Sequence, residues 1–207
     1  MKAYTLAEGV ELVKAARHTI DLWTKSPNFR NSVIEGTLER EKFSQSYGVF
    51  VTLNNYQTGS LRGCIGFIEG IKPMKNLLVE AALAAASEDP RFVPVSAREL
   101  DDIIVEVSIL SRPERLRGTA DEIKKKIRIG IDGLIIEYGY HKGILLPIVA
   151  VEEKFGPIEF LENVCLKAGL PKDMWRREGV SLYHFSTQIF REKTPGGDVE
   201  EVRLEQL

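Results

Sequence analysis

The order of alternating and helical apolar patterns is the feature that most constrains the fold of this chain. Two segments, YGVFVTLNN from Tyr47 and LRGCIGFI from Leu61, alternate like β-strands and are separated by a short polar turn. A helix rich in alanine is predicted over residues 73–87, and the β-branched segment DIIVEVSIL at 102–110 predicts a further strand. The order is therefore strand, strand, helix, strand.

The same order recurs over residues 130–191. The segments IGIDGLIIEYG and GILLPIVAV are predicted strands, residues 157–169 a predicted helix, and residues 181–191 a last strand. The two halves share no obvious residue identity, so the repeat is one of topology only. Together they predict an α+β fold with mainly antiparallel sheet.

The segments at the two ends add less specific predictions. Thr5 and Glu8 have the spacing of a capping box and predict a first helix that ends near Lys25. Residues 26–41 lack clear periodicity and are expected to form a short helix or a covering loop. The tail from Lys193 contains proline and glycine and is expected to be largely exposed to solvent.

Composition narrows the function classes. With 207 residues, 43% of them hydrophobic and 28% charged, the chain reads as a soluble globular protein, and its longest apolar runs are too short for a membrane span, so a cytoplasmic location is expected. A formal charge of -2 gives no field that favours nucleic acid. The chain has no phosphate-binding loop, dinucleotide fingerprint or metal-ligand spacing, so no cofactor and no metal are predicted.

The strand LRGCIGFI carries polar residues that a buried strand does not need. Side chains alternate across a strand, so Arg62, Cys64 and Gly66 share one face. Gly66 has no side chain, which predicts open space beside the thiol, and glycine in a strand often marks the close approach of a ligand. This face is therefore predicted to be the wall of a pocket, with Cys64 as the candidate catalytic residue.

The strand at 102–110 supplies a second polar row. Glu106 and Ser108 share one of its faces, and a carboxylate among β-branched neighbours needs a partner. Arg62 is the expected partner of Glu106 if the two strands are neighbours. Arg91, after the Asp-Pro turn, is expected to supply a second guanidinium for an anion or a carboxylate.

A structural interpretation stands beside the pocket interpretation. A free cysteine is often a small buried apolar side chain, and the glycines of this strand are also explained if the alanine helix packs closely against it. The ion pair of Arg62 would then be structural. The two cysteines, Cys64 and Cys165, are expected to be reduced thiols.

Several segments of the sequence carry a resemblance to a known family. They are YGVFVTL, LRGCIG, EDPRF followed by a proline, IIVEVSIL, IGIDGLIIE, the LLP of GILLPIV, and FLENVCLKAGLP. These segments span nearly the whole chain and resemble the AMMECR family, whose signature LRGCIG falls on residues 61–66. The resemblance implies two subdomains with mainly antiparallel sheets flanked by helices, and a cleft between them.

The resemblance also implies boundaries and partners. The larger subdomain is expected to hold both termini, at 1–111 plus 180–207, and the smaller inserted one to span 112–179. Bacterial relatives are associated with proteins that resemble a Memo-type dioxygenase and a radical-SAM enzyme, which implies a shared modification pathway. The resemblance implies no established activity.

Three functions stay open at this point. The first is an enzyme or enzyme partner, with Cys64 as nucleophile or ligand contact and Arg62 favouring its thiolate. The second is a binding module in which Arg62, Arg91 and the backbone around Gly63 and Gly66 recognise a nucleotide, RNA or peptide. The third is a scaffold in a multiprotein complex.

Overall fold

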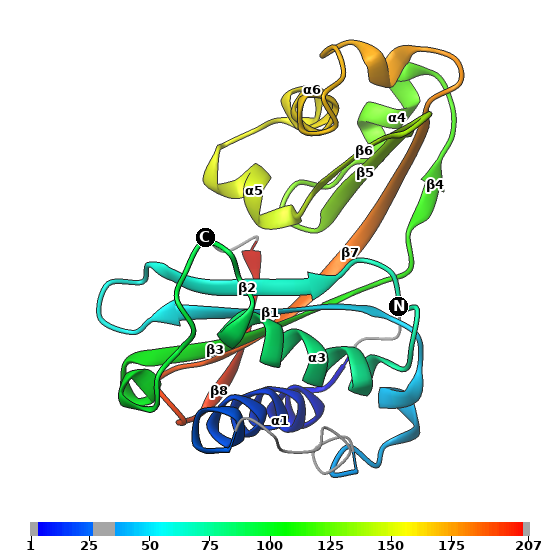
Figure 1. The fold of residues 1–207 in the computed structure, drawn as a ribbon. Helices are drawn as coiled ribbons and strands as arrows, with labels where there is room; N and C mark the ends of the chain where they lie inside the picture. Colours follow the sequence, from blue (N-terminus) through cyan, green and yellow to red (C-terminus); the bar gives the residue numbers. More distant parts are fainter. Residues whose placement is uncertain (1–3, 27–35, 205–207) are drawn as a thin grey trace. The chain divides into compact units, whose positions relative to one another are not determined.

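The computed structural model describes residues 4–26 and 36–204 (Figure 1). The prediction for residues 26–41 falls largely outside this range. Contacts group the chain into two compact units. Unit 1 contains Ser111–Thr187, and unit 2 combines the segment Lys2–Leu110 with Gln188–Val202.

Unit 2 is built on antiparallel strands covered by two helices. The strands β1 (Gly48–Asn55), β2 (Leu61–Phe67) and β3 (Ile103–Leu110) pair with β1 in the centre. The helices α1 (Leu6–Lys25) and α3 (Met74–Ser87) pack on one face of these strands and on each other (Figure 1). The predicted capping box is present, because Thr5 and Glu8 bond each other's backbone N–H at the start of α1.

The core of unit 2 lies between these helices and the strands. Alternate side chains of β1 and β3 point inward, which is the period of a strand with one face on the core. The fully buried side chains include Leu12, Val13 and Ile20 of α1, Leu78, Ala81 and Ala82 of α3, Val49, Val51 and Leu53 of β1, and Val105 and Val107 of β3.

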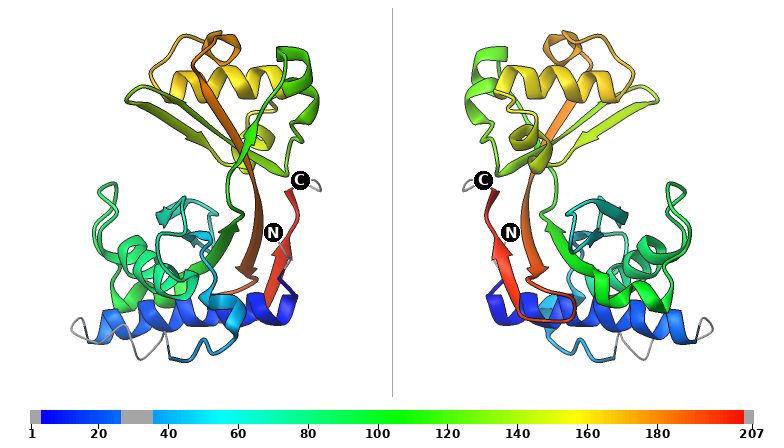
Figure 2. Two further views of the ribbon diagram at one scale, coloured as in Figure 1. Left: turned by 90° about the vertical axis from the view of Figure 1, so that its right-hand side faces the viewer. Right: turned by 90° about the vertical axis from the view of Figure 1, so that its left-hand side faces the viewer.

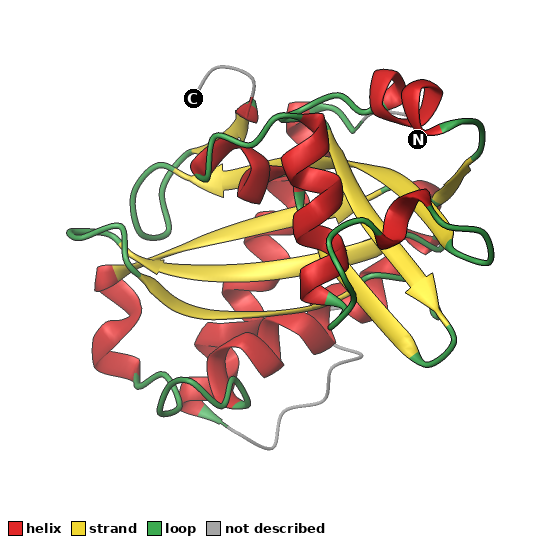
Figure 3. Ribbon diagram, turned by 90° about the horizontal axis from the view of Figure 1, so that it is seen from above, coloured by secondary structure: helices red, strands yellow, loops and turns green. Residues whose placement is uncertain are grey.

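Unit 1 has its own sheet and its own core. Its strands are β4 (Glu114–Leu116), β5 (Asp132–Tyr138), β6 (His141–Leu145) and the first part of β7 (Ser181–Glu192). The helices α4 (Ala120–Lys126), α5 (Pro147–Glu152) and α6 (Pro157–Lys167) complete the unit. Figure 3 shows strands in yellow and helices in red. The core includes Leu134, Ile136, Phe160, Leu161 and Val164.

Strand β7 takes part in both units. Its residues Ser181–Ser186 pair with β5, and its residues Ile189–Glu192 pair with β8 (Val199–Val202). Figure 2 shows β8 in red beside the blue α1, with which it is in contact. The strand pairs of both units are antiparallel, so the predicted α+β class with antiparallel sheet is confirmed. The predicted subdomain boundaries stay a prediction.

One prediction of secondary structure is wrong. The predicted strand GILLPIVAV ends at Leu145, and Pro147 instead occupies the first turn of α5, where its missing N–H is not needed. Most of the described tail after Lys193 is exposed or half-buried, but it also contains β8, which was not predicted, which pairs with β7 and in which Val199 is buried. A short strand of mixed polarity gives too weak an alternation to be found by pattern alone.

The alanine helix lies unusually close to the signature strand. A Cβ atom added at Gly63 would lie 2.2 Å from the carbonyl oxygen of Ala85, which is helix backbone and cannot move aside like a side chain. The small residues of α3 and the missing side chain of Gly63 together allow this approach.

We expect Gly63→Ala to lower the free energy of unfolding by about 3 kcal/mol, the upper end for overpacking a well-packed core. Gly156→Ala is the control, because the added methyl group would meet only the flexible end of Glu159. Gly156 caps α6 without a side-chain hydrogen bond, so Gly156→Ala removes no such bond. It should lower the free energy of unfolding by less than about 1 kcal/mol. Urea denaturation of both variants measures the difference, and equal losses would rule out the close approach as the reason for this glycine.

Candidate functional site

Strand β2 presents its side chains to two different environments. Gly63 faces Ala85 of α3, and Ile65 and Phe67 pack against the core of unit 2. Arg62, Cys64 and Gly66 alternate with them and lie on the other face. Gly63 is therefore explained by the structural interpretation, in which the alanine helix packs closely against this strand. It lies on the face of β2 opposite to the Cys64 thiol.

The Cys64 thiol belongs to a row of polar residues that crosses three strands. Thr52 of β1 pairs with Cys64 on one side and with Glu106 of β3 on the other. The Thr52 hydroxyl donates to Cys64 Sγ at 3.3 Å. Glu106 is therefore placed in one row with Cys64 across the intervening strand β1, and not by a pairing with Arg62.

Burial raises the pKa of the half-buried Cys64 thiol. The hydrogen bond from Thr52 and the charge of Arg91 oppose this change, whereas the carboxylates of Glu106 and Asp89 add to it. A raised pKa lowers the fraction of thiolate, the form that acts as a nucleophile.

Asp89 and Arg91 hold the backbone of the signature strand at Cys64. The buried Asp89 carboxylate accepts from Cys64 N at 2.8 Å and from Arg91 Nε and Nη2 at 2.9 and 2.7 Å. Arg91 Nη2 also donates to the Cys64 carbonyl at 3.3 Å. The Arg91 guanidinium, together with the backbone N–H groups of Cys64 and Arg91, holds the pKa of the Asp89 carboxyl well below its usual range, against the effect of burial.

The predicted pairing of Arg62 with Glu106 is wrong. Arg62 Nε donates to Glu99 Oε2 at 2.7 Å, and its Nη2 donates to the Val93 carbonyl at 2.9 Å. The Arg62 guanidinium is the main cause that lowers the pKa of the Glu99 carboxyl. Glu99 is fixed by a capping box with Ser96, and the spacing SARE at 96–99 was a signal that could have identified it.

The predicted open space beside Gly66 is also wrong. Phe50 of β1 pairs with Gly66, and a Cβ atom added there would lie 2.4 Å from the Phe50 ring. The aromatic ring thus occupies the place of the missing side chain. Ser108 pairs with Phe50 from the other side and is buried, so it lies in the adjacent cross-strand row, on the same face of β3 as Glu106.

A surface cluster lies where residues 91–93 meet Arg62. The Phe92 ring lies near two cations, with the guanidinium carbons of Arg62 and Arg91 at 5.8 and 5.5 Å from its centroid. The adjacent Val93 is 77% exposed. We call Arg62, Arg91, Phe92 and Val93 the signature edge. Phe92 and Val93 were not predicted as site residues, since the sequence signal in EDPRF suggested only a turn.

The described residues contain no group of three or more histidine, cysteine or acidic side chains that could hold a metal ion. Cys64 and Cys165 are both free thiols. Within 4–26 and 36–204, none of the helices combines the length and the hydropathy needed to cross a membrane.

The hydrogen bonds of the Asp89 carboxylate with Cys64 and Arg91 predict that the stability of the protein depends on pH. The lowered pKa of Asp89 stabilises the folded protein at pH values above the ordinary carboxyl pKa of about 4, and this contribution is lost as the pH falls below it. Asp89→Asn should therefore lower the free energy of unfolding at pH 7 by about 1.5–3 kcal/mol and should reduce its fall between pH 5 and pH 3. Guanidinium denaturation across this range measures both effects, and parallel curves for the two proteins would contradict the role of Asp89.

Comparison with known proteins identifies relatives along the whole chain. A family model described as AMMECR1 matches residues 13–190. Protein MJ0810 of Methanocaldococcus jannaschii is 47% identical over 205 residues, which cover 99% of this chain and 100% of that protein. A protein of Aquifex aeolicus is 43% identical over 194 residues, which cover 94% and 97%.

A solved structure has the same fold. The crystal structure of the uncharacterized protein PH0010 from Pyrococcus horikoshii is similar with a TM-score of 0.86 and 39% identity, over 95% of this chain and 97% of that one. The match to the family model and the identity to these relatives agree with the signature at residues 61–66. The chain belongs to the AMMECR1 family.

Proposed function

We propose that the protein is a non-covalent binding module that recognises a peptide segment of a partner protein at the signature edge. The observation that carries this proposal is the combination of a highly exposed Val93 with an aromatic ring, Phe92, that contacts two guanidinium groups. Aromatic and arginine side chains are enriched among the residues that dominate protein interfaces.

The signature edge is preorganised. Glu99 fixes Arg62, and Asp89 fixes Arg91, so neither guanidinium must be immobilised when a partner binds. Each ion pair uses the Nε and Nη2 groups, and within the described residues no hydrogen bond involves Nη1 of Arg62 or of Arg91. The Arg91 side chain is 53% exposed. These remaining donors suit a carboxylate on the peptide.

The chemistry of the peptide follows from these groups. Val93 and Phe92 favour an apolar side chain, and the Nη1 donors of the two arginines favour a neighbouring aspartate or glutamate. A segment with an acidic residue beside a large apolar one is the expected ligand. Candidate sources of such a segment are proteins that resemble the Memo-type and radical-SAM partners implied by the family. Binding of such partners would also make the protein a scaffold in a multiprotein complex.

Catalysis by Cys64 is the alternative, and the raised pKa of its thiol argues against it. We expect the rate of iodoacetamide modification of Cys64, followed by mass spectrometry, to give a pKa above the value of about 8.5 for an ordinary thiol. Arg91→Gln should raise this pKa further, because it removes the cation that favours the thiolate. A value below that of N-acetylcysteine in the same buffer would favour the enzyme.

The binding module is tested with an array of twelve-residue peptides, including matched pairs in which the acidic residue is replaced by its amide. We expect binding of peptides with adjacent acidic and apolar residues, weakened at least about tenfold by Val93→Asp, as for a central interface residue. Ile71→Asp is the control, because Ile71 lies in the same unit and is 70% exposed but is not part of the signature edge. No enrichment, or equal loss in both variants, would refute the proposal.

A further inference from the structure

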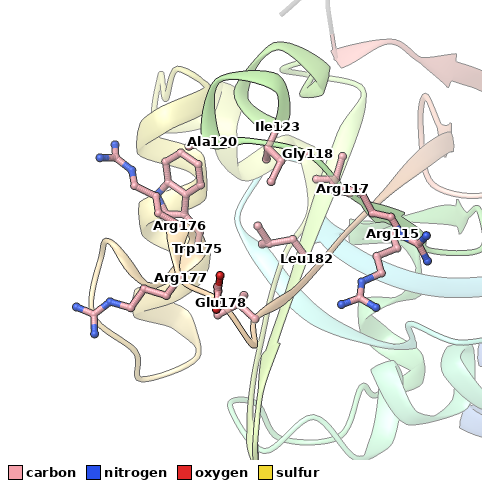
Figure 4. A pocket seen from close by; sticks show the side chains of 12 residues that line it. Arg115, Arg117, Gly118, Ala120, Ile123, Trp175, Arg176, Arg177, Glu178 and Leu182 are labelled. Atoms are coloured by element: carbon pink, nitrogen blue, oxygen red, sulfur yellow. The ribbon is translucent and has the colours of Figure 1, made fainter.

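A second candidate site lies within unit 1 and shares no residue with the signature edge. It is a pocket of about 500 Å³ between β4, the start of α4 and the segment that leads from η3 (Met174–Arg176) into β7 (Figure 4). This volume is in the range of pockets that hold small organic ligands.

The floor of the pocket is apolar and its rim is cationic. Leu116, Ile123 and Leu182 are buried floor residues, and Trp175 beside them is only 4% exposed. Figure 4 shows Arg115 and Arg117 on one side of this floor, with Arg176 and Arg177 on the other. Glu178 is the one acidic residue that lines the pocket. Four arginines around one pocket contrast with the formal charge of -2 for the whole chain.

The arginines differ in how far the protein already neutralises them. Arg177 pairs with Asp173 at 2.8 Å. Arg115 donates to the Ser181 hydroxyl at 3.1 Å. Because a hydroxyl is neutral, this hydrogen bond does not neutralise the charge of Arg115. Within the described residues, no carboxylate forms an ion pair with Arg115 or Arg117. The side with Arg115 and Arg117 is therefore the stronger anion-binding side.

The opposite side offers a planar surface. The Arg176 guanidinium lies over the Trp175 ring at 4.7 Å, and Arg176 itself is exposed. Guanidinium planes stack on aromatic rings, so a ligand ring can stack on Arg176. In addition, the buried Trp175 Nε1–H has no acceptor among the described residues, a state that costs about 1–3 kcal/mol.

We infer that this pocket binds a small organic phosphate with an aromatic ring, of the size and chemistry of a mononucleotide. The ring lies on the apolar floor and against Arg176, and the phosphate oxygens accept hydrogen bonds from Arg115 and Arg117. Phosphate is the anion that the fork of N–H donors on a guanidinium matches in a bidentate manner.

Calorimetric titration of the full chain with ADP tests this inference, with adenosine and inorganic pyrophosphate as separate arms. We expect ADP to bind, and each of the other two compounds to bind at least about tenfold more weakly, because each lacks one half of the recognised chemistry. No binding of ADP, equal binding of adenosine, or equal binding of pyrophosphate would each overturn the inferred ligand class.

Substitutions locate the site. Arg117→Glu should weaken ADP binding by about tenfold or more, the loss expected for a charge-assisted hydrogen bond. Arg203→Glu makes the same change of net charge at an exposed residue that does not line the pocket, and it should leave the affinity within about twofold. Equal effects of the two substitutions would show non-specific attraction and would overturn the assignment.

A spectroscopic signal provides an independent readout. The chain has two tryptophans, so Trp175 is the only one left in Trp23→Phe. ADP should change the Trp175 fluorescence with the same dissociation constant that calorimetry gives. A calorimetric signal without any fluorescence change would place the ligand elsewhere and contradict the inference.

Discussion

A buried ion pair between Arg17 and Glu192 is the interaction on which unit 2 depends. The two side chains lie 175 positions apart, and Arg17 donates to both carboxylate oxygens of Glu192. Arg17 also donates to the carbonyls of Leu100 and Ile103, at 3.2 and 2.7 Å, and Glu192 accepts from Val105 N at 2.9 Å. The attraction in a buried charge pair offsets the cost of desolvation only when the remaining hydrogen-bonding groups also have partners. In this pair, those partners are the carbonyls of Leu100 and Ile103 and the N–H of Val105. The ion pair thereby fixes helix α1 to the start of β3 and to the end of β7. The position of β3 in turn sets the position of Glu106 in the cross-strand row that includes Thr52 and Cys64.

The signature strand packs against the alanine helix on one face and lies at an edge of its sheet. Gly63 allows the alanine helix to approach, so part of the signature is explained by the core alone. The backbone at Cys64 is an edge of the sheet, and Asp89 and Arg91 cover its N–H and carbonyl groups. Covered edges do not pair with other strands. The Cys64 thiol is half-buried in this arrangement and accepts the hydrogen bond from Thr52.

Much of the fold could be predicted from the sequence, because its local signals agree with the final structure. The capping box at Thr5, the alternation in β1 and β3, and the small residues of α3 each act within one element. The partners in the site depend instead on register and on loops. Arg62 and Glu106 lie on strands that flank β1 on opposite sides, and periodicity cannot tell that β1 lies between them or that the turn after α3 brings Glu99 within reach. For the same reason, the pocket near Trp175 combines residues from β4, α4 and η3 that no sequence spacing connects.

The distance in sequence between Arg17 and Glu192 also orders events during synthesis. The segment Ser111–Thr187 of unit 1 is continuous, so the ribosome delivers nearly all of that unit in one stretch. Unit 2 begins first but needs Gln188–Val202, so a nascent chain that has reached residue 187 still carries Arg17 without its carboxylate and α1 without β8. Unit 2 therefore receives its last strand, β8, after all the strands of unit 1 have been translated, and until then the part of α1 that β8 contacts stays uncovered.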